Sequence, residues 1–437
     1  MKISEIHIEQ LYGTYSYHIV NLQNQQLLVL TGYNGMGKTT ILNIVKNISE
    51  SNLWFFYELD FKKIAILFEN KMSLEIESYI EETQQLEDET HLDQNINPEK
   101  GITYTWKNDG KDLCKLQLDR HQFYEAFASI FKSELYAEED KNWIILMKDN
   151  MREVLRYICK KQHALSFEML QASVKAFMIP AQRLKQIRKM RKDENRYPFV
   201  DDSLEEIDTI DTIAEKLARL LYSKKVDFLE RVQRSKNSLM DRLLDERTED
   251  LGKDEYESIA HRVKARIDDL KSFGISYEKV RPYDSSNGKL LSAYLLGLQD
   301  TLKEYTDVLN DLKLFDSILK EKQFLHKKVC FSPDYGLKVL NDKGVSISNS
   351  SLSSGEQNVI ILLYRIIFEM QEAEILLIDE PEISMHVVWL KEFVEDLRKI
   401  AVGKDNLQIL IATHSPLIVR GALEYTFDLE MKQAYGK

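Results

Sequence analysis

The pattern of apolar and polar residues predicts buried strands near both ends of the chain. One apolar run, 27–30, comes before a glycine-rich segment, and two more, 375–378 and 409–411, lie towards the far end. Short apolar runs bounded by turn signals are typical of buried strands. After the first run, apolar residues recur at the spacing of one helix face: Ile41, Ile44, Val45 and Ile48. The pattern therefore predicts a buried strand, a glycine-rich loop and a helix in succession.

The pattern changes after this first helix. Residues 54–120 contain alternating polar and apolar stretches, such as 64–68 and 73–80, which predict an antiparallel sheet beside the α/β core. The acidic segment 81–100 is predicted to be a long hairpin loop, and residues 121–176 are predicted to be mainly helical.

The middle of the chain predicts long helices. Residues 204–250 have the spacing of an amphipathic helix, and 253–282 are expected to form a tip of shorter helices. The returning segment places apolar residues at steps of four and three: Leu291, Leu295, Leu298, Leu302, Tyr305, Leu309 and Leu312. This is the pattern of a coiled coil, but a helix packed in a compact bundle fits three heptads equally well. Strands expected at 329–331 and 337–340 return the chain to the core.

Length and charge limit the classes of protein that fit. The 437 residues suffice for two structural units, and the net charge of −12 argues against a generally basic nucleic-acid binder. Cys114, Cys159 and Cys330 are widely spaced without a metal-ligand pattern, which fits a reducing compartment. The first residues predict a strand and not a signal peptide, and no apolar run approaches the roughly 20 residues that cross a membrane. We therefore expect a cytoplasmic protein without membrane contact.

The glycine-rich segment 31–40 fits a phosphate-binding loop. Gly32 and Gly37 bracket four residues and are followed by Lys38 and Thr39. In such a loop the backbone N–H groups surround anionic oxygens, and the start of the next helix adds partial positive charge. Lys38 is expected to reach the β- and γ-phosphates of a nucleotide, and Thr39 to ligate Mg²⁺. A glycine-rich turn before an ordinary helix is the alternative.

Three later segments place polar residues at the ends of predicted elements. Segment 352–357 comes before a long apolar run, one apolar strand ends in Asp379 and Glu380, and His414 follows another. Taken singly, the first also fits a helix-capping box, the carboxylates a turn, and the histidine a core position. Their order along the chain makes coincidence implausible.

Taken together, these segments resemble the ABC-class ATPases, and within them the SMC/RecF/Rad50-like group with a helical insertion. The matching segments are Gly32–Thr40 (Walker A), Leu352–Gln357 (signature), Ile375–Glu380 (Walker B), Ser384–His386 (D-loop) and His414 (switch histidine). The chain looks closest to bacterial ATPases of the OLD type and of phage-defence systems such as Septu and PARIS.

The resemblance implies an α/β fold: an ABC-type nucleotide-binding domain with a mixed sheet, an antiparallel β subdomain and an inserted α-helical or short coiled-coil arm. It places an N-terminal lobe with the Walker A loop at 1–182, the insertion at 183–328 and a C-terminal lobe at 329–437. The OLD-type nuclease module would be expected after His414, and it is absent from the roughly two dozen residues that follow.

By the same resemblance, two ATP molecules with Mg²⁺ lie between two protomers. One chain holds each ATP through its Walker A loop: Asn34, Gly35, Met36, Gly37, Lys38, Thr39 and Thr40. The other chain covers it with its signature residues: Ser353, Ser354, Gly355 and Glu356.

The resemblance also implies roles in hydrolysis. Asp379 is expected to hold Mg²⁺ with Thr39, Glu380 to polarise the attacking water, and His414 to contact the γ-phosphate together with Lys38. Gln182 is the candidate for a glutamine that contacts Mg²⁺ and senses the γ-phosphate. Catalysis of this kind is positioning plus charge stabilisation.

The chain departs from the family pattern at two places. Segment 11–15 has no arginine where the family often has one, and Tyr12 or Tyr15 is a candidate for stacking on the base, with a buried core position as the alternative. The His-Pro of the family after the D-loop is His386-Val387 here.

A basic cluster follows the first lobe: Arg183, Lys185, Arg188, Lys189, Arg191, Lys192 and Arg196. One interpretation is a surface that tracks the phosphates of DNA or RNA. The other is a solvated face, or a site for an acidic partner.

Three functions fit these observations. The favoured hypothesis is a slow ATPase, a homodimer or higher oligomer, that is the sensor or regulatory half of an anti-phage defence system and controls a separately encoded nuclease or toxin. The alternatives are a RecF/Rad50-like DNA-repair ATPase that binds DNA ends, and a scaffold that assembles with ATP but hardly hydrolyses it.

Overall fold

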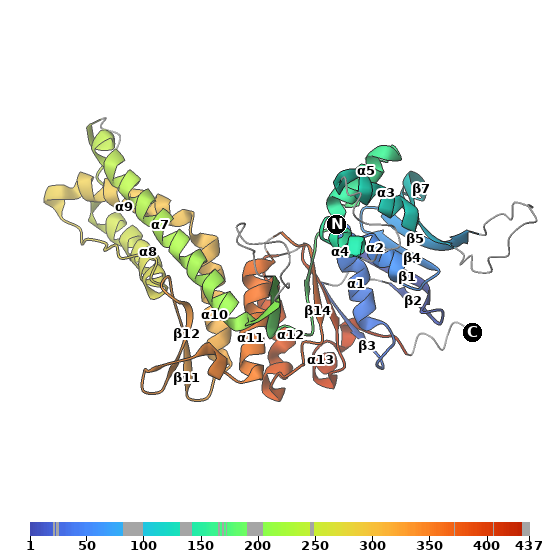
Figure 1. Cartoon of the computed structure of the whole chain (residues 1–437). Coiled ribbons are helices and arrows are strands. Elements are labelled where there is room, and N and C mark those ends of the chain that lie inside the picture. The colour runs from blue at the N-terminus through green and yellow to red at the C-terminus, as the bar shows by residue number, and fades with distance from the viewer. Residues whose placement is uncertain are drawn as a thin grey trace, which may run out of the picture. The chain divides into compact units, whose positions relative to one another are not determined.

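The fold is that of a computed structural model of the chain (Figure 1). Two compact units make up the chain. The first unit comprises Met1–Ala181, Met370–Ile383 and Val387–Lys437, and the second comprises Gln182–Glu369 and Ser384–His386. The structure describes residues 1–20, 22, 26–81, 99–131, 142–164, 167, 170–171, 173–189, 204–244, 249–370, 372–404 and 406–430.

A five-stranded parallel sheet forms the centre of the first unit, in the order β16-β3-β15-β14-β8. Its strands are β3 (Leu27–Thr31), β8 (Ala176–Ile179), β14 (Ile375–Asp379), β15 (Gln408–Ala412) and β16 (Thr426–Asp428). Every residue of β14 and β15 is buried, as expected for a parallel sheet covered on both faces. The three strands predicted from apolar runs are confirmed.

Helix α1 (Lys38–Ser49) packs against this sheet through β8, β14 and β15. Its apolar face is buried as the spacing predicts, with Ile41 and Ile44 fully covered. Two further helices of the unit, α12 (Val387–Ala401) and α13 (Pro416–Gly421), contact each other. Because β3, β14 and β15 are parallel, their carboxyl ends share one edge of the sheet, where α1 begins.

A six-stranded antiparallel sheet completes the first unit, in the order β2-β1-β4-β5-β6-β7. Its strands are β1 (Ile3–Leu11), β2 (Tyr15–Ile19), β4 (Lys63–Phe68), β5 (Met72–Glu81), β6 (Glu99–Asn108) and β7 (Lys111–Leu118). The predicted antiparallel sheet is therefore confirmed, and with it the mixed α/β fold. Strands β5 and β6 pair as far as Glu81 and Glu99, and the rest of the predicted acidic loop, 82–98, lies outside the described residues.

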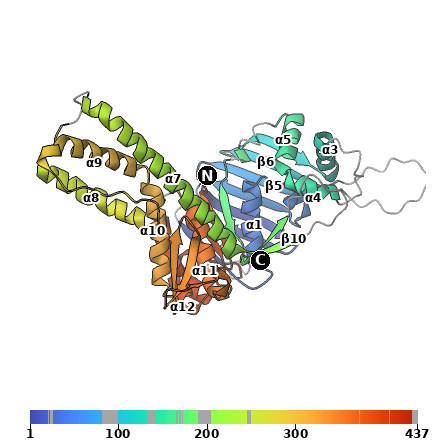
Figure 2. The same cartoon turned by 60° about the vertical axis from the view of Figure 1, so that its left-hand side comes forward.

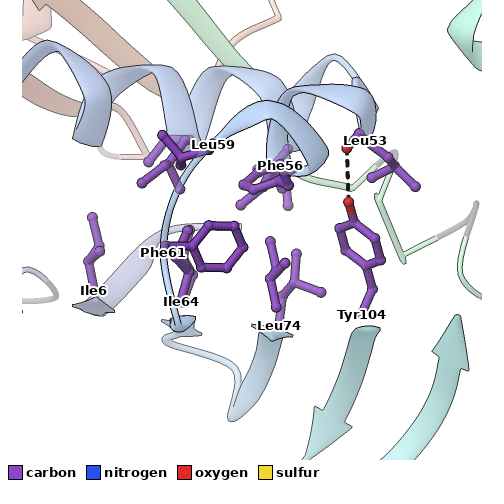
Figure 3. Close-up of a cluster of buried hydrophobic side chains, with 14 of the residues drawn as sticks. Ile6, Leu53, Phe56, Leu59, Phe61, Ile64, Leu74 and Tyr104 are labelled. Atoms are coloured by element: carbon purple, nitrogen blue, oxygen red, sulfur yellow. Dashed lines mark hydrogen bonds between the residues drawn. The ribbon is translucent and has the colours of Figure 1, made fainter. Parts of the chain in front are cut away.

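Helix α2 (Trp54–Glu58) covers the inner face of the antiparallel sheet. Figure 3 shows Phe56 of this helix above Leu74 of the sheet, and both are buried. The Tyr104 hydroxyl donates a hydrogen bond of 2.9 Å to the carbonyl of Leu53, at the start of the helix. Burial raises the pKa of Tyr104 well above its ordinary value, so the phenol keeps its proton and this bond.

Three more helices pack on one another in the first unit: α3 (Arg120–Phe131), α4 (Asn142–Asp149) and α5 (Met151–Lys161). Trp143 of α4 is buried edge-on against Trp54, with ring centroids 5.6 Å apart. These helices confirm the prediction that begins at residue 121.

The helices of the second unit are α7 (Thr209–Leu244), α8 (Gly252–Ser272), α9 (Gly288–Lys303) and α10 (Thr306–Glu321). Figures 1 and 2 both show α7, α8 and α9 side by side, and α9 contacts the other two. The long helix predicted at 204–250 is confirmed over Thr209–Leu244.

The heptad pattern that begins at Leu291 extends over two helices and not over one. All seven of its apolar residues are buried, but the helix stops at Lys303 and a new one starts at Thr306. Tyr305 lies at the break, where its hydroxyl is 2.5 Å from the Asp227 carboxylate of α7 and its ring packs edge-on against Phe228. Tyr305 thus contacts α7 at the turn between the two helices, and α9, which packs on α7 and α8, fits the alternative of a helix within a bundle.

A small sheet and the predicted signature segment follow these helices. The sheet comprises β11 (Lys327–Ser332), β12 (Gly336–Asn341) and β13 (Ser346–Ile347), which confirms the two strands expected there. Gly336 has a φ of +65°, and a Cβ at this position would lie 1.8 Å from the carbonyl oxygen of Ala214, so only glycine fits against α7. Helix α11 (Ser354–Tyr364) continues as a π-helical segment, Arg365–Glu369. Within the described ranges, none of the helices is long and apolar enough to span a bilayer.

Candidate nucleotide-binding site

The loop between β3 and α1 has the geometry of an anion-binding turn. Gly32, Gly35 and Gly37 all have positive φ angles. A Cβ at Gly37 would lie 2.8 Å from Cδ2 of Leu11, so the loop and β1 can approach this closely only with glycine. No side chain at the N-cap accepts a hydrogen bond from the first turn of α1, which leaves backbone N–H groups for an anionic ligand.

Lys38 is a buried cation at the centre of this loop, with 5% of its surface exposed. Its Nζ donates hydrogen bonds to the carbonyl oxygens of Gly32 at 2.9 Å and Tyr33 at 3.0 Å. Burial lowers the pKa of Lys38, and the carboxylates of Glu380, Asp379 and Glu382 oppose this effect. A buried ammonium that donates hydrogen bonds to neutral carbonyls is suited to bind an anion such as a phosphate.

Two side chains whose oxygen atoms could ligate a metal ion lie next to each other beside the loop. The Thr39 hydroxyl donates a hydrogen bond of 2.9 Å to Oδ1 of Asp379, and Asp379 is buried. Oxygen ligands of this kind suit Mg²⁺, which usually takes one or two protein ligands and completes its shell with phosphate oxygens and water. The described part of the chain has no cluster of three or more His, Cys, Asp or Glu that could hold a metal alone. These residues therefore fit Mg²⁺ that is shared with a nucleotide.

Glu380 and His414 face each other across the ends of β14 and β15. Oε1 of Glu380 lies 3.9 Å from Nε2 of His414, and each side chain is about one third exposed. The Glu380 backbone donates a hydrogen bond of 2.8 Å to Ala412 and has a φ of +42°. Such a conformation costs a non-glycine residue about 1–3 kcal/mol and is concentrated at functional sites.

Sequence reasoning assigned no role to Glu382, and the structure places it in the same group. Its Oε1 accepts hydrogen bonds from the Thr413 hydroxyl at 2.8 Å and from the His414 backbone N–H at 2.6 Å. Its Oε2 is buried without a hydrogen-bond partner among the described residues. The available signal was a third carboxylate three residues after the end of the strand that carries Asp379.

The remaining residues of the Walker A segment line or brace the loop. Asn34 and Gly35 are exposed, whereas Met36 is buried and its carbonyl accepts a hydrogen bond of 2.7 Å from the Tyr17 hydroxyl. The hydroxyls of Thr40 and Tyr12 are 2.5 Å apart. Tyr12 is 44% exposed, so of the two alternatives for this tyrosine the buried core position is wrong. Tyr15 is half-buried and stacks on Tyr17, with ring centroids 6.1 Å apart.

The predicted signature residues begin α11 in the second unit. Ser353 is the N-cap, and its hydroxyl accepts a hydrogen bond from the Glu356 N–H at 3.3 Å. Oε2 of Glu356 accepts hydrogen bonds from the Ser353 N–H and from Lys327 Nζ, both at 2.7 Å. The segment is thus a capping box, which was its alternative interpretation. The amides of Ser354 and Gly355 lie in the first turn, where no acceptor within the helix exists.

Glu356 is buried and ionised. Burial raises the pKa of its carboxyl, but the hydrogen bonds from Lys327 and Ser353 outweigh this and hold the pKa below the ordinary value.

Two other predictions fall in the second unit. Gln182 is exposed at its start, and its role stays a prediction. The D-loop, Ser384–His386, belongs to this unit by its contacts.

The structure divides the basic cluster. Arg183 is buried, and its Nε donates a hydrogen bond of 3.2 Å to Asn358, so it belongs to the interior. Arg188 and Lys189 lie on β9 (Lys185–Lys189), which pairs with β10 (Leu204–Asp208). The other three predicted members lie outside the described residues: Arg191, Lys192 and Arg196.

The sequence matches the family described as AAA ATPase domain over residues 1–419. The chain belongs to this AAA ATPase domain family. Among curated proteins, none matches it.

This AAA ATPase domain protein also matches solved structures of SMC head domains at low similarity. One is the SMC head domain of Pyrococcus furiosus, with an extended coiled coil and bound to the C-terminal domain of ScpA; it is 12% identical, with 96% of this chain and 91% of that chain covered and a TM-score of 0.33. Another is the SMC head domain of Thermotoga maritima, at 9% identity, 96% and 92% coverage and a TM-score of 0.33.

Proposed function

We propose that this protein binds and slowly hydrolyses ATP, and that it works as a dimer in which each ATP lies between two chains. The observation that carries the proposal is the group of side chains at one edge of the parallel sheet: Lys38, Thr39, Asp379, Glu380 and His414. These residues come from three separate parts of the sequence, and the fold brings them within hydrogen-bonding or ion-pairing range of their neighbours.

The chemistry follows from the position of each group. Lys38 and the first amides of α1 hold the β- and γ-phosphates, and Lys38 stabilises the negative charge that develops on them. Thr39 and Asp379 hold Mg²⁺, which when bound neutralises further phosphate charge. Glu380 orients and polarises the attacking water, and His414 contacts the γ-phosphate from the neighbouring strand end.

The second chain supplies the start of its α11. The Ser353 turn presents the amides of Ser354 and Gly355 with the positive end of the helix dipole behind them. Gly355 has no side chain to keep a phosphate away. Joint binding of this kind makes association of the protomers depend on ATP, so hydrolysis becomes a timer for the assembled state.

We infer further that this timer regulates a separately encoded effector, a nuclease or toxin, in anti-phage defence. The resemblance of the motif set to Septu- and PARIS-type ATPases supports this role. The net charge of −12 and the burial of Arg183 count against a broad DNA-binding surface. Neither the DNA-repair role nor the scaffold role gains a specific observation.

Affinity purification from the native host tests both parts of the proposal. Tagged Glu380→Gln protein with ATP should retain a partner in a fixed ratio, while Lys38→Ala protein under the same conditions should not. Purified wild type should release phosphate from ATP. Phosphate release without any ATP-dependent partner would support the ATPase and reject the effector; duplex DNA as the only ligand retained would favour the repair role.

A further inference from the structure

Glu382 joins the two loops that carry the proposed catalytic pair. It lies two residues beyond Glu380, and its Oε1 accepts hydrogen bonds from the Thr413 hydroxyl and from the backbone N–H of His414. The Thr413 hydroxyl in turn accepts a hydrogen bond of 2.9 Å from the Ser415 N–H. One carboxylate oxygen thereby fixes three consecutive residues of the opposite loop.

These bonds begin where the sheet ends. The last ladder contacts are Asp379 beside Ala412 and the hydrogen bond from the Glu380 N–H to Ala412. Beyond them β14 and β15 separate, although the Thr413 N–H still donates a hydrogen bond of 3.1 Å to Leu30 of β3, and the backbone at Glu380 has a positive φ. The spacing between Glu380 and His414 therefore depends on contacts beyond the pairing of β14 with β15. The hydrogen bonds of Glu382 are such contacts.

We propose that Glu382 is a positioning residue for ATP hydrolysis, which holds His414 at its 3.9 Å spacing from Glu380. This inference rests on the proposed function. Thr413 is fully buried, so water does not compete with its hydrogen bond to Glu382. Oε1 of Glu382 accepts two hydrogen bonds and Oε2 is buried. Glu382 therefore positions His414 relative to Glu380, and Glu380 polarises the attacking water.

Oε2 of Glu382 allows a matched pair of variants to be designed. Because Oε2 has no hydrogen-bond partner among the described residues, Glu382→Gln exchanges it for an amide NH₂ and keeps Oε1 as the acceptor. Glu382→Ala removes the acceptor altogether. A second pair acts from the opposite side, since Thr413→Ser keeps the hydroxyl and Thr413→Val removes it.

Steady-state kinetics with ATP distinguishes positioning from binding. Glu382→Ala is expected to lower kcat about 10- to 100-fold, because small misplacements of reacting groups have effects of this size. KM should change less than about threefold, since the contacts of Lys38 are untouched. Glu382→Gln and Thr413→Ser should stay within about threefold of wild type in kcat, and Thr413→Val should fall with Glu382→Ala. Equal losses in Glu382→Gln and Glu382→Ala, or a normal kcat in Glu382→Ala, would overturn the inference.

Hydrogen–deuterium exchange of the nucleotide-free protein tests the contact without reference to activity. The His414 amide should exchange faster in Glu382→Ala than in wild type, and at the wild-type rate in Glu382→Gln. Unchanged exchange in Glu382→Ala would refute the contact, whatever the kinetics show. A wild type that binds but never hydrolyses ATP would instead reject the proposed function, while the exchange rates would still decide whether Glu382 holds His414.

Discussion

Glu356 and Glu382 both accept hydrogen bonds from backbone N–H groups. They differ in whether a carboxylate oxygen remains buried without a hydrogen-bond partner among the described residues. Oε2 of Glu356 accepts hydrogen bonds from the Ser353 N–H and from Lys327 Nζ, so the carboxylate at the start of α11 is paired with a cation. Oε1 of Glu382 accepts hydrogen bonds from the Thr413 hydroxyl and the His414 N–H. Its Oε2 is buried without a hydrogen-bond partner among the described residues.

The surroundings of the two glutamates show the same contrast. Near Glu382, the Lys38 ammonium donates to neutral carbonyls and Glu380 holds a strained φ. A buried cation and a strained backbone at one place indicate a functional site. The turn at Ser353 is held by its own hydrogen bonds. The edge of the sheet should therefore respond to ATP much more strongly than the isolated turn.

Replacement of the proposed water-polarising group should have the largest effect. Glu380→Gln is expected to lower kcat about 1,000-fold, because the amide cannot accept a proton. ATP affinity should stay within about threefold, since the phosphate contacts remain. Phosphate release and equilibrium binding measure the two quantities, with the surface variant Glu395→Gln as the control. A normal rate of hydrolysis would show that the wrong residue was assigned.

Loss of the buried cation should be next in size. Lys38→Ala is expected to weaken ATP binding about 100-fold, because a charged hydrogen-bond partner of the phosphates disappears. Isothermal titration calorimetry measures the affinity. Lys46 is a partly exposed residue on the same helix that pairs with Glu50, and Lys46→Ala should bind ATP as the wild type does. Equal affinities in the two variants would remove Lys38 from the site.

A substitution at Ser353 separates its two roles. Aspartate caps helices as well as serine does, whereas alanine costs about 1 kcal/mol. Ser353→Asp should therefore unfold like the wild type, but its carboxylate would face the γ-phosphate of the partner's ATP and lower turnover about tenfold or more. Urea unfolding and phosphate release check this prediction. Full turnover in Ser353→Asp would limit the turn to its role as a cap.

The smallest effect concerns the Glu356–Lys327 pair. Glu356→Gln should cost about 1 kcal/mol of stability at pH 7, a modest value because Lys327 is partly exposed. The pKa of Glu356 is lower in the folded state than its ordinary value of 4.5. Its ionised form therefore contributes stability above that value, and the contribution is lost as the pH falls through the folded-state pKa. The difference between wild type and variant in urea unfolding should shrink from pH 7 to below pH 4, and a constant difference would speak against the ion pair.

The sequence predicted those parts of the fold that depend on local patterns. The buried strands were recognisable because runs such as 375–378 of β14 are apolar without interruption. The Lys38 loop was recognisable because glycine positions and spacing are local properties. The break at Tyr305 was not predictable, since the apolar spacing continues through it and the Tyr305 hydroxyl contacts Asp227, a residue 78 positions away.

The candidate site shows the same limit. Lys38, Asp379, Glu380 and His414 each stand in a short motif, and the resemblance of these motifs to those of ABC-class ATPases predicted that the four residues share a site. Glu382 could not be assigned a role, because its partners Thr413 and His414 are defined only once β14 and β15 are neighbours.

The most direct test of the account is the mass of Glu380→Gln protein in solution with and without ATP and Mg²⁺, measured by sedimentation velocity. Joint binding predicts that nucleotide converts the protein into a dimer or an even-numbered assembly, and that adding Ser353→Asp to the same chain prevents the change. An association state that is identical with and without ATP, in protein shown to have bound the nucleotide, would contradict it.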